Sequence, residues 1–311
     1  MIAWVRQKAI PLIKTISVLI IIIALLFVGR KIWLASDQLL LHADKPKLVV
    51  IVILFGLFYI INDILLAYIW KRLLSWFGDT QVSLKTCLGI YGRTQIAKYI
   101  PGNFLHLPNR HMTGWQSGLS HPAQIGAATY EISGLLVTSG ILAVIGLFKL
   151  NDPETFLMPE TTILVIITFS IVLITFSSLY IVQFFLPRIQ GINIPSRTWA
   201  EILKVLLPTW MLYFGFFGIT GLIIYGIIGA LTGKWFDISP WIVFSASGTA
   251  WVLGFITPGA PAGAGVREAI LILILSKFTG EATSISIALI LRMITILGDV
   301  GFYLIAQFIL R

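Results

Sequence analysis

The sequence predicts an all-α polytopic membrane protein, on the evidence of its composition, its long apolar runs and two Pro-Gly breaks. Hydrophobic residues fill 58% of the 311 positions, charged residues fill only 11%, and the mean hydropathy is +0.95. An ordinary soluble domain is about 25% charged, so this composition excludes a soluble globular fold. The apolar runs are continuous in Ile, Leu and Val, which favours helices over the alternating strands of a membrane β-barrel.

Several apolar runs reach the roughly 20 residues that an α-helix needs to cross about 30 Å of hydrocarbon. The first run follows basic residues, as the apolar part of a signal peptide does. It is too long for that role and no A-x-A-type cleavage site follows, so we interpret it as a retained span. The six predicted full transmembrane helices are Thr15–Leu34, Leu48–Trp70, Gln124–Phe148, Thr162–Leu186, Leu206–Ala230 and Ala282–Ile309.

Two further regions are too short and too polar for simple spans, and a Gly/Pro turn interrupts each of them. The first turn contains Pro101 and Gly102, and the second runs from Pro258 to Gly263. We predict a broken or re-entrant helix pair at each turn, with a simple packing kink as the alternative. The predicted segments are Ser83–Tyr99 with Asn103–Ser117, and Pro240–Thr257 with Ala264–Phe278.

The two turns also relate the halves of the chain to each other. Pro-Gly occurs only at Pro101 and Pro258, and an Arg follows nine positions later in each case. These arginines, Arg110 and Arg267, are 157 residues apart. When the numbers of the early spans are increased by the same offset, each span coincides with a later span or overlaps one. Each half crosses the membrane an odd number of times, so we predict inverted-topology repeats, as in many transporters. The predicted repeats cover about 1–155 and 158–311 of a single membrane domain, 1–311.

The net charge of +9 arises from 22 Lys and Arg against 13 Asp and Glu. No polybasic block occurs, so we expect anionic lipid headgroups rather than nucleic acid as the partner of this charge. Lys and Arg near the span ends are more numerous on the side of the N-terminus. This bias predicts a multi-pass protein of the plasma (inner) membrane with both termini in the cytoplasm. Cys87 is the single cysteine and the His residues lack ligand spacing, so no disulfide, metal site or cofactor is expected.

Polar side chains around the first turn suit an anion such as phosphate. Lys98 precedes the turn. Asn103, His106 and Arg110 follow it at intervals of three and four, on one face of a short helix. Gly102 would let the backbone approach an anion closely, and the N-terminus of the following helix would add N–H donors. The alternative is an interfacial helix that contacts lipid phosphates without specificity.

The second turn is rich in glycine and is followed by the adjacent charges Arg267 and Glu268. Neighbouring residues point in different directions on a helix, so we expect separate partners for these two side chains. Gly259, Gly263 and Gly265 are predicted to offer backbone N–H groups to an anion, as at the first turn.

Charged residues inside the apolar spans predict an intramembrane network, because a charge at the bilayer centre costs roughly 2.5–3.5 kcal/mol on insertion scales. Arg292 and Asp299 share a helix face but are separated by about 10.5 Å of rise, so each needs a partner elsewhere. Glu268 is the first candidate for Arg292. Glu131 and Asp63 are the alternatives, and purely structural ion pairs are the competing interpretation. The predicted substrate-binding residues are Lys98, Asn103, His106, Arg110, Arg267, Glu268 and Arg292.

Two stretches resemble the signatures of a known family. They are Gln95-Ile-Ala-Lys-Tyr-Ile-Pro-Gly-Asn103 with Arg110, and Pro261-Ala-Gly-Ala-Gly-Val-Arg-Glu268. They are similar to motifs of the flippase-like membrane region of lysylphosphatidylglycerol synthases, and the resemblance extends over nearly the whole chain. Ala262 departs from the pattern, since the family usually has Gly there. The resemblance implies a stand-alone member that moves or presents anionic or glycosylated lipids, without the aminoacyl-transferase domain.

Three functions stay open at this stage. Translocation of an anionic or polyprenyl-linked, glycosylated lipid is the first, with membrane lipids as partners. The alternatives are a non-transporting accessory subunit of a glycosyltransferase in a cell-envelope glycan pathway, and an integral-membrane enzyme. The motifs G-x-S-x-G, H-E-x-x-H and G-x-x-x-x-G-K-[ST] are absent from the sequence, so we expect neither hydrolysis nor ATP-driven pumping.

Overall fold

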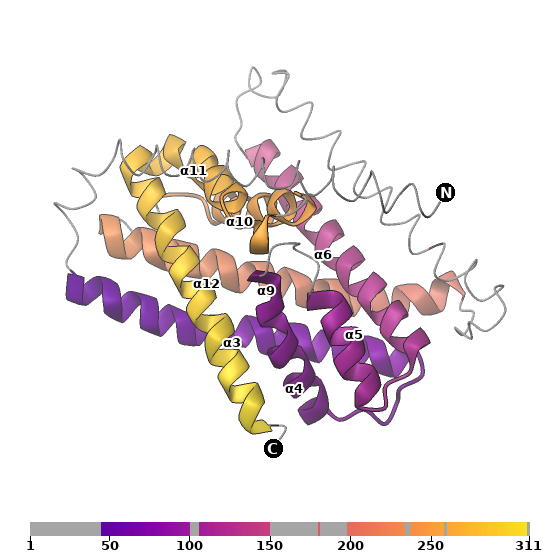
Figure 1. Ribbon diagram of the computed structural model, residues 1–311. Coiled ribbons are helices and arrows are strands. Elements are labelled where there is room, and N and C mark those ends of the chain that lie inside the picture. The colour runs from indigo at the N-terminus through magenta and orange to yellow at the C-terminus, as the bar shows by residue number, and fades with distance from the viewer. Residues whose placement is uncertain are drawn as a thin grey trace, which may run out of the picture.

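A computed structural model describes residues 45–99, 106–149, 180, 198–233, 237–257 and 260–309 of the chain. These residues fold only into helices and connecting turns (Figure 1). Four helices are long and apolar enough to cross a membrane. They are α3 (Lys45–Trp76), α6 (His121–Lys149), α9 (Trp199–Thr232) and α12 (Glu281–Ile309). The described part of the chain is all-helical, as expected of an all-α membrane protein.

These four helices correspond to four of the six predicted spans. α3 continues beyond its predicted end to Trp76, because Leu73 and Leu74 in its last turns are fully buried in the core. The other two predicted spans, Thr15–Leu34 and Thr162–Leu186, lie outside the described residues apart from Tyr180.

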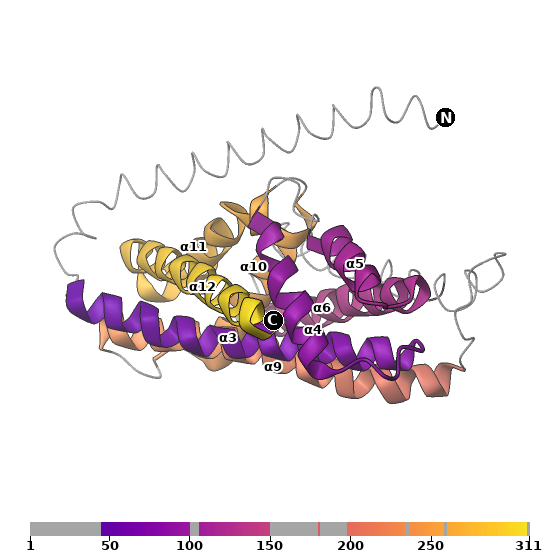
Figure 2. The same cartoon turned by 60° about the horizontal axis from the view of Figure 1, so that its bottom comes forward.

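The helices α3 and α9 lie side by side and run in opposite directions (Figure 1, Figure 2). Phe55 packs against Gly226, and Nδ2 of Asn62 donates a hydrogen bond of 3.0 Å to Oγ1 of Thr220. Residue numbers therefore increase along α3 as they decrease along the adjacent α9, so the two helices are antiparallel. Lipid tails are as apolar as Leu, so the hydrophobic effect does not drive helices together inside a membrane. Helices there associate through interhelical hydrogen bonds and through close packing, which small residues such as Gly permit.

Short helices occupy both regions that the sequence predicts as broken pairs. The first region contains α4 (Leu84–Gln95), the 3-10 turn η2 (Ile96–Tyr99) and α5 (His106–Gln116). The second contains α10 (Pro240–Ile256), the 3-10 turn η5 (Pro261–Gly263) and α11 (Val266–Thr279). The Pro-Gly pairs themselves, at 101–102 and 258–259, lie outside the described residues.

The short helices bring the two halves together. α4 packs against α12, and α10 packs against α6, so each half places its first short helix on the last long helix of the other. The turns η2 and η5 also contact each other. Figure 2 shows α12 and α4 lying over α3 on one side of the α3 and α9 pair. The 3-10 turns that flank the two breaks therefore lie next to each other.

Aromatic side chains fill the interior near these breaks. Trp70, Tyr91, Tyr130 and Phe217 are almost completely buried and belong to one contiguous core. The indole of Trp70 meets the ring of Tyr91 edge-on, with centroids 6.1 Å apart. Such a packed aromatic core fixes the positions of the polar groups that lie next to it.

Candidate functional site

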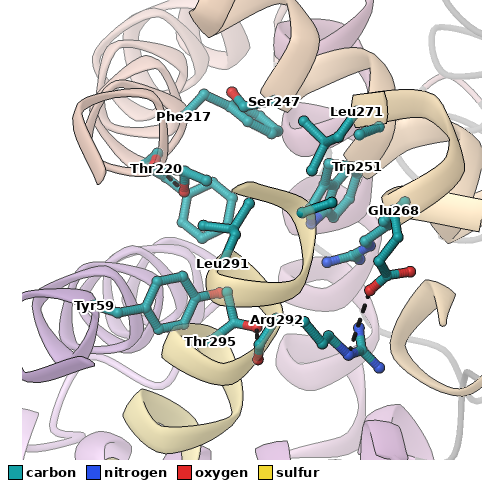
Figure 3. A pocket seen from close by; sticks show the side chains of 14 residues that line it. Tyr59, Phe217, Thr220, Ser247, Trp251, Glu268, Leu271, Leu291, Arg292 and Thr295 are labelled. Carbon is teal, nitrogen blue, oxygen red and sulfur yellow. Dashed lines mark hydrogen bonds and ion pairs between the residues drawn. The ribbon is translucent and has the colours of Figure 1, made fainter. Parts of the chain in front are cut away.

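Two cavities meet between the halves of the protein. The first, about 50 Å³, is lined by residues of α3, α9, α10, α11 and α12 (Figure 3). The second, about 60 Å³, lies toward η2 and α5. Each has room for a few water molecules or one small anion. The residues that line both cavities, and so form the wall between them, are Tyr59, Phe216, Trp251 and Arg267.

Arg267 is the cation of this shared wall. It lies in the first turn of α11, and its Cζ is 5.7 Å from the ring centroid of Trp251, a cation–π contact. A Cβ atom at Gly254 would collide with Cγ of Arg267, and one at Gly263 would lie 2.6 Å from its Nε. These two glycines therefore make room for the arginine side chain.

No carboxylate among the described residues forms an ion pair with Arg267. Its Nε is buried and also lacks a hydrogen-bond partner there. A half-buried guanidinium is costly to leave without an acceptor, and it binds carboxylates and phosphates through parallel N–H donors. Arg267 is therefore the best candidate for an anion-binding group.

Glu268, next to it, is occupied by other partners. Its Oε1 lies 3.5 Å from Nε of Arg292, and a dashed line marks this ion pair in Figure 3. Its Oε2 accepts a 2.6 Å hydrogen bond from the backbone N–H of Gly265. Arg292 also donates to the carbonyl oxygens of Pro261 and Ala262, at 3.3 and 3.1 Å. The predicted pairing of Arg292 with Glu268 is confirmed, and it ties α12 to the second turn.

Asp299 finds its partners at the other turn. Nζ of Lys98 lies 2.7 Å from its Oδ1, and the hydroxyl of Tyr99 donates to its Oδ2. The prediction that Asp299 needs a partner from another helix is confirmed. The Lys98 side chain is partly exposed and lines the second cavity, so this ion pair forms part of the cavity wall.

Arg110 does not lie where the sequence predicts it, in one anion-binding cavity with Lys98. Its side chain is 3% exposed, and its Nη2 lies 3.0 Å from Oε1 of Glu131. Its Cζ stacks 4.3 Å from the ring centroid of Tyr91, and the Tyr91 hydroxyl donates to the same Glu131 oxygen at 2.8 Å. Arg110 is not among the residues that line either cavity. A buried guanidinium is costly to leave without an acceptor, and Glu131 on α6 supplies one for Arg110.

The remaining predicted residues fall into two groups. His106 lines the second cavity together with Lys98. Asn103, Gly102 and Gly259 lie outside the described residues.

The predicted backbone anion sites at Gly263 and Gly265 are already occupied by the protein. The N–H of Gly263 donates to the carbonyl of Ala260 at 2.9 Å, and that of Gly265 donates to Glu268. Both N–H groups stabilise the turn before α11 and are not free for a ligand. The glycines instead permit positive φ angles of 71° and 81°.

The 157-residue offset reveals a difference between the halves. It relates Arg110 to Arg267 and Glu131 to Ala288. Glu131 lies on α6 and Ala288 on α12, and Ala288 lines the first cavity together with Arg267. Where the first half buries a carboxylate against its arginine, the second half has a methyl group and a cavity.

Sequence reasoning missed several residues of the site. Tyr59 and Trp251 lie inside apolar runs, and nothing in the local pattern distinguishes them from core aromatics. Ala288 could have been found, because applying the offset to Glu131 leads directly to it.

The described residues contain no group of three or more His, Cys, Asp or Glu side chains that could hold a metal ion. No protein-family model matches the chain, and no curated protein is significantly similar to it. The function is therefore inferred from the geometry of the site.

Proposed function

We propose that the protein translocates anionic lipids across the membrane and that Arg267 binds the phosphate of the headgroup. The observation that carries this proposal is the contrast between the two halves: Arg110 is paired with Glu131, whereas Arg267 faces a cavity beside Ala288. A lipid phosphate would take the place of the missing carboxylate. It offers the negative charge and the paired oxygens that a guanidinium binds in parallel.

Because Arg267 lies between the two cavities, a ligand could reach its guanidinium from either cavity. Arg267 lines both of them, so a phosphate held by Arg267 can pass from one cavity to the other when the shared wall moves. Arg292 and Glu268 line the first cavity as an ion pair, and Lys98 lines the second, so each cavity has polar groups besides Arg267. Both cavities are small compared with the roughly 300–1,000 Å³ of typical ligand pockets, so translocation requires a more open conformation while the acyl chains stay in the lipid.

Inverted-topology repeats are part of the proposal. Both halves have the order long helix, short helix, 3-10 turn, short helix and long helix. The antiparallel pairing of α3 and α9, and the exchanged contacts of α4 with α12 and α10 with α6, fit a two-fold axis in the membrane plane. With the two spans predicted at 15–34 and 162–186, the repeats would make a six-span protein of the plasma (inner) membrane with cytoplasmic termini. The resemblance to flippase-like membrane regions implies movement or presentation of anionic or glycosylated lipids, which agrees with this proposal.

Lipid movement in reconstituted liposomes tests the proposal. The probe is fluorescent phosphatidylglycerol, followed by chemical quenching of the outer leaflet, with a glycosyl diacylglycerol, which has no phosphate, carrying the same label for comparison. Arg267→Gln should slow phosphatidylglycerol at least about tenfold, because a charge-assisted hydrogen bond is worth about 1.5–3 kcal/mol. Ala288→Glu should have a similar effect, since its carboxylate would pair with Arg267 as Glu131 pairs with Arg110.

Ala288→Gln is the matched control, because it has nearly the same volume as Ala288→Glu but no charge. It should keep a much larger share of the activity than Ala288→Glu. Equal losses in these two variants would show that cavity volume, not charge, is what matters. Wild-type rates in Arg267→Gln, or equal movement of both lipids by the native protein, would contradict the proposed anion site.

A further inference from the structure

Asp63 is a buried acid in the middle of α3 that the anion site does not use. Its side chain is 1% exposed, and neither carboxyl oxygen receives a hydrogen bond from a donor of the described residues. α12 packs against α3, and the carboxyl of Asp299 on α12 interacts electrostatically with that of Asp63. Two carboxyl groups that interact in an apolar interior repel each other unless one of them carries a proton.

The surroundings decide which carboxyl holds the proton. Asp299 accepts hydrogen bonds from Lys98 and Tyr99, and these donors stabilise its ionised form. Asp63 has no such donor, and two adjacent carboxylates cannot both stay ionised in an apolar interior. In this conformation Asp63 is therefore the protonated member of the pair.

We propose that Asp63 is a proton-binding site that couples anion binding at Arg267 to the uptake of one proton. This inference rests on the proposed function, which it supplies with a driving force. Asp299 on α12 and Lys98 on η2 are charged groups that act on the Asp63 carboxyl. The charged and titratable side chains around the carboxyl pair are Tyr59 on α3, Lys98 and Tyr99 on η2, Arg267 on α11, and Arg292 on α12.

The coupling follows from the charge of the cluster formed by Asp63, Asp299 and Lys98. With the proton in place the cluster is neutral, and without it the cluster carries one negative charge. Tyr59 connects the cluster to the anion site, because it lines both cavities and interacts electrostatically with Asp63 and Arg267. A negative cluster would oppose a second anion nearby. Linkage is reciprocal, so a proton on Asp63 favours the anion and a bound anion favours the proton.

The geometry points to a proton rather than a metal cation. The ammonium group of Lys98 already lies 2.7 Å from Asp299, where a cation would have to bind. A carboxyl pair with a lysine as its third member offers too few oxygen ligands for a sodium or calcium ion.

Two measurements test the inference, and the first does not depend on transport. Infrared difference spectroscopy of the detergent-solubilised protein at neutral pH should show the C=O stretch of a buried carboxylic acid. Asp63→Asn should lose this band, whereas Asp237→Asn, which removes an exposed acid, should keep it. The second measurement follows fluorescent phosphatidylglycerol in liposomes under an imposed pH gradient or an imposed sodium gradient.

In the native protein and in Asp237→Asn, the movement of phosphatidylglycerol should respond to the pH gradient and not to the sodium gradient. Asp63→Asn should lose the response to pH, which for one coupled proton amounts to about tenfold per pH unit at most. Absence of the infrared band overturns the inference, and so does a response of Asp63→Asn equal to that of the native protein. If the band is present but the native protein moves no lipid, the proposed function fails and its coupling to the proton fails with it, while the protonated acid stands.

Discussion

Nη2 of Arg110 lies 3.0 Å from Oε1 of Glu131, so the protein itself satisfies the charge of this arginine. The arginine at the corresponding position of the other half, Arg267, has no such carboxylate among the described residues. Two side chains of the same type, in matching positions, are therefore expected to have different roles. Arg110 pairs α5 with α6, whereas Arg267 is proposed to bind an anion.

Glu131→Ala should destabilise the protein by about 3–5 kcal/mol, because it leaves the buried Arg110 guanidinium without its carboxylate. Arg267→Gln should cost far less, since it breaks no ion pair within the protein. Unfolding titrations in mixed micelles measure both values. A Glu131→Ala variant as stable as the native protein would show that the pair does not hold the fold together. Replacing Arg110 and Glu131 together by Met and Leu should cost less than Glu131→Ala alone.

Gly254→Ala should slow the movement of anionic lipid while leaving the protein folded. The added Cβ would collide with Cγ of Arg267 and displace its guanidinium, whereas Ala within a helix favours folding by about 0.5–1 kcal/mol over Gly. Gly218→Ala on α9 is the control, because its Cβ would meet no atom within 4 Å. The liposome assay compares the two variants. Equal rates in both would mean that the position of Arg267 is not critical.

Ala262→Gly should stabilise the protein by about 0.5–1 kcal/mol. Ala262 has a φ of 49°, in the left-handed region that Gly adopts without strain, and the resemblance to flippase-like regions also implies Gly there. Ala264→Gly should have the opposite effect, because Ala264 has an ordinary φ of −54° and its replacement only increases the freedom of the unfolded chain. Thermal unfolding of the two variants should shift in opposite directions, and a common shift would contradict the strain at Ala262.

The contact between His111 and His121 should weaken in acid. Nε2 of His111 lies 2.7 Å from Nδ1 of His121, and burial together with the second imidazole lowers the pKa of His111. A lowered pKa means that folding favours the neutral ring. The contribution is therefore present above the ordinary histidine value of about 6.5 and is lost as the pH falls below it.

Trp115 reports this change, because its ring stacks on His121 with centroids 5.4 Å apart. Its fluorescence should change as the pH is lowered through the histidine range, and His121→Gln should abolish that change. A transition that persists unaltered in His121→Gln would have to come from another group.

The helical elements could largely be predicted from the sequence. A run of apolar residues long enough for a span, and a Pro-Gly turn that interrupts a shorter one, are local properties. α3, α6, α9 and α12 accordingly lie where the apolar runs predict them. The pairing of Arg292 with Glu268 was also predictable, because the rise of a helix excludes Asp299 as the partner and leaves few acids in apolar surroundings.

The sequence by itself determined an all-helical chain with two Gly/Pro breaks and a set of charges too costly to leave unpaired in hydrocarbon. Only the tertiary structure decided how these charges are matched: Arg110 with Glu131, Lys98 and Asp63 with Asp299, and Arg267 with a cavity. The reason is physical. Helix formation and hydrophobicity act over neighbouring residues, whereas a buried charge is satisfied by whichever side chain the packing of distant helices brings within about 3 Å.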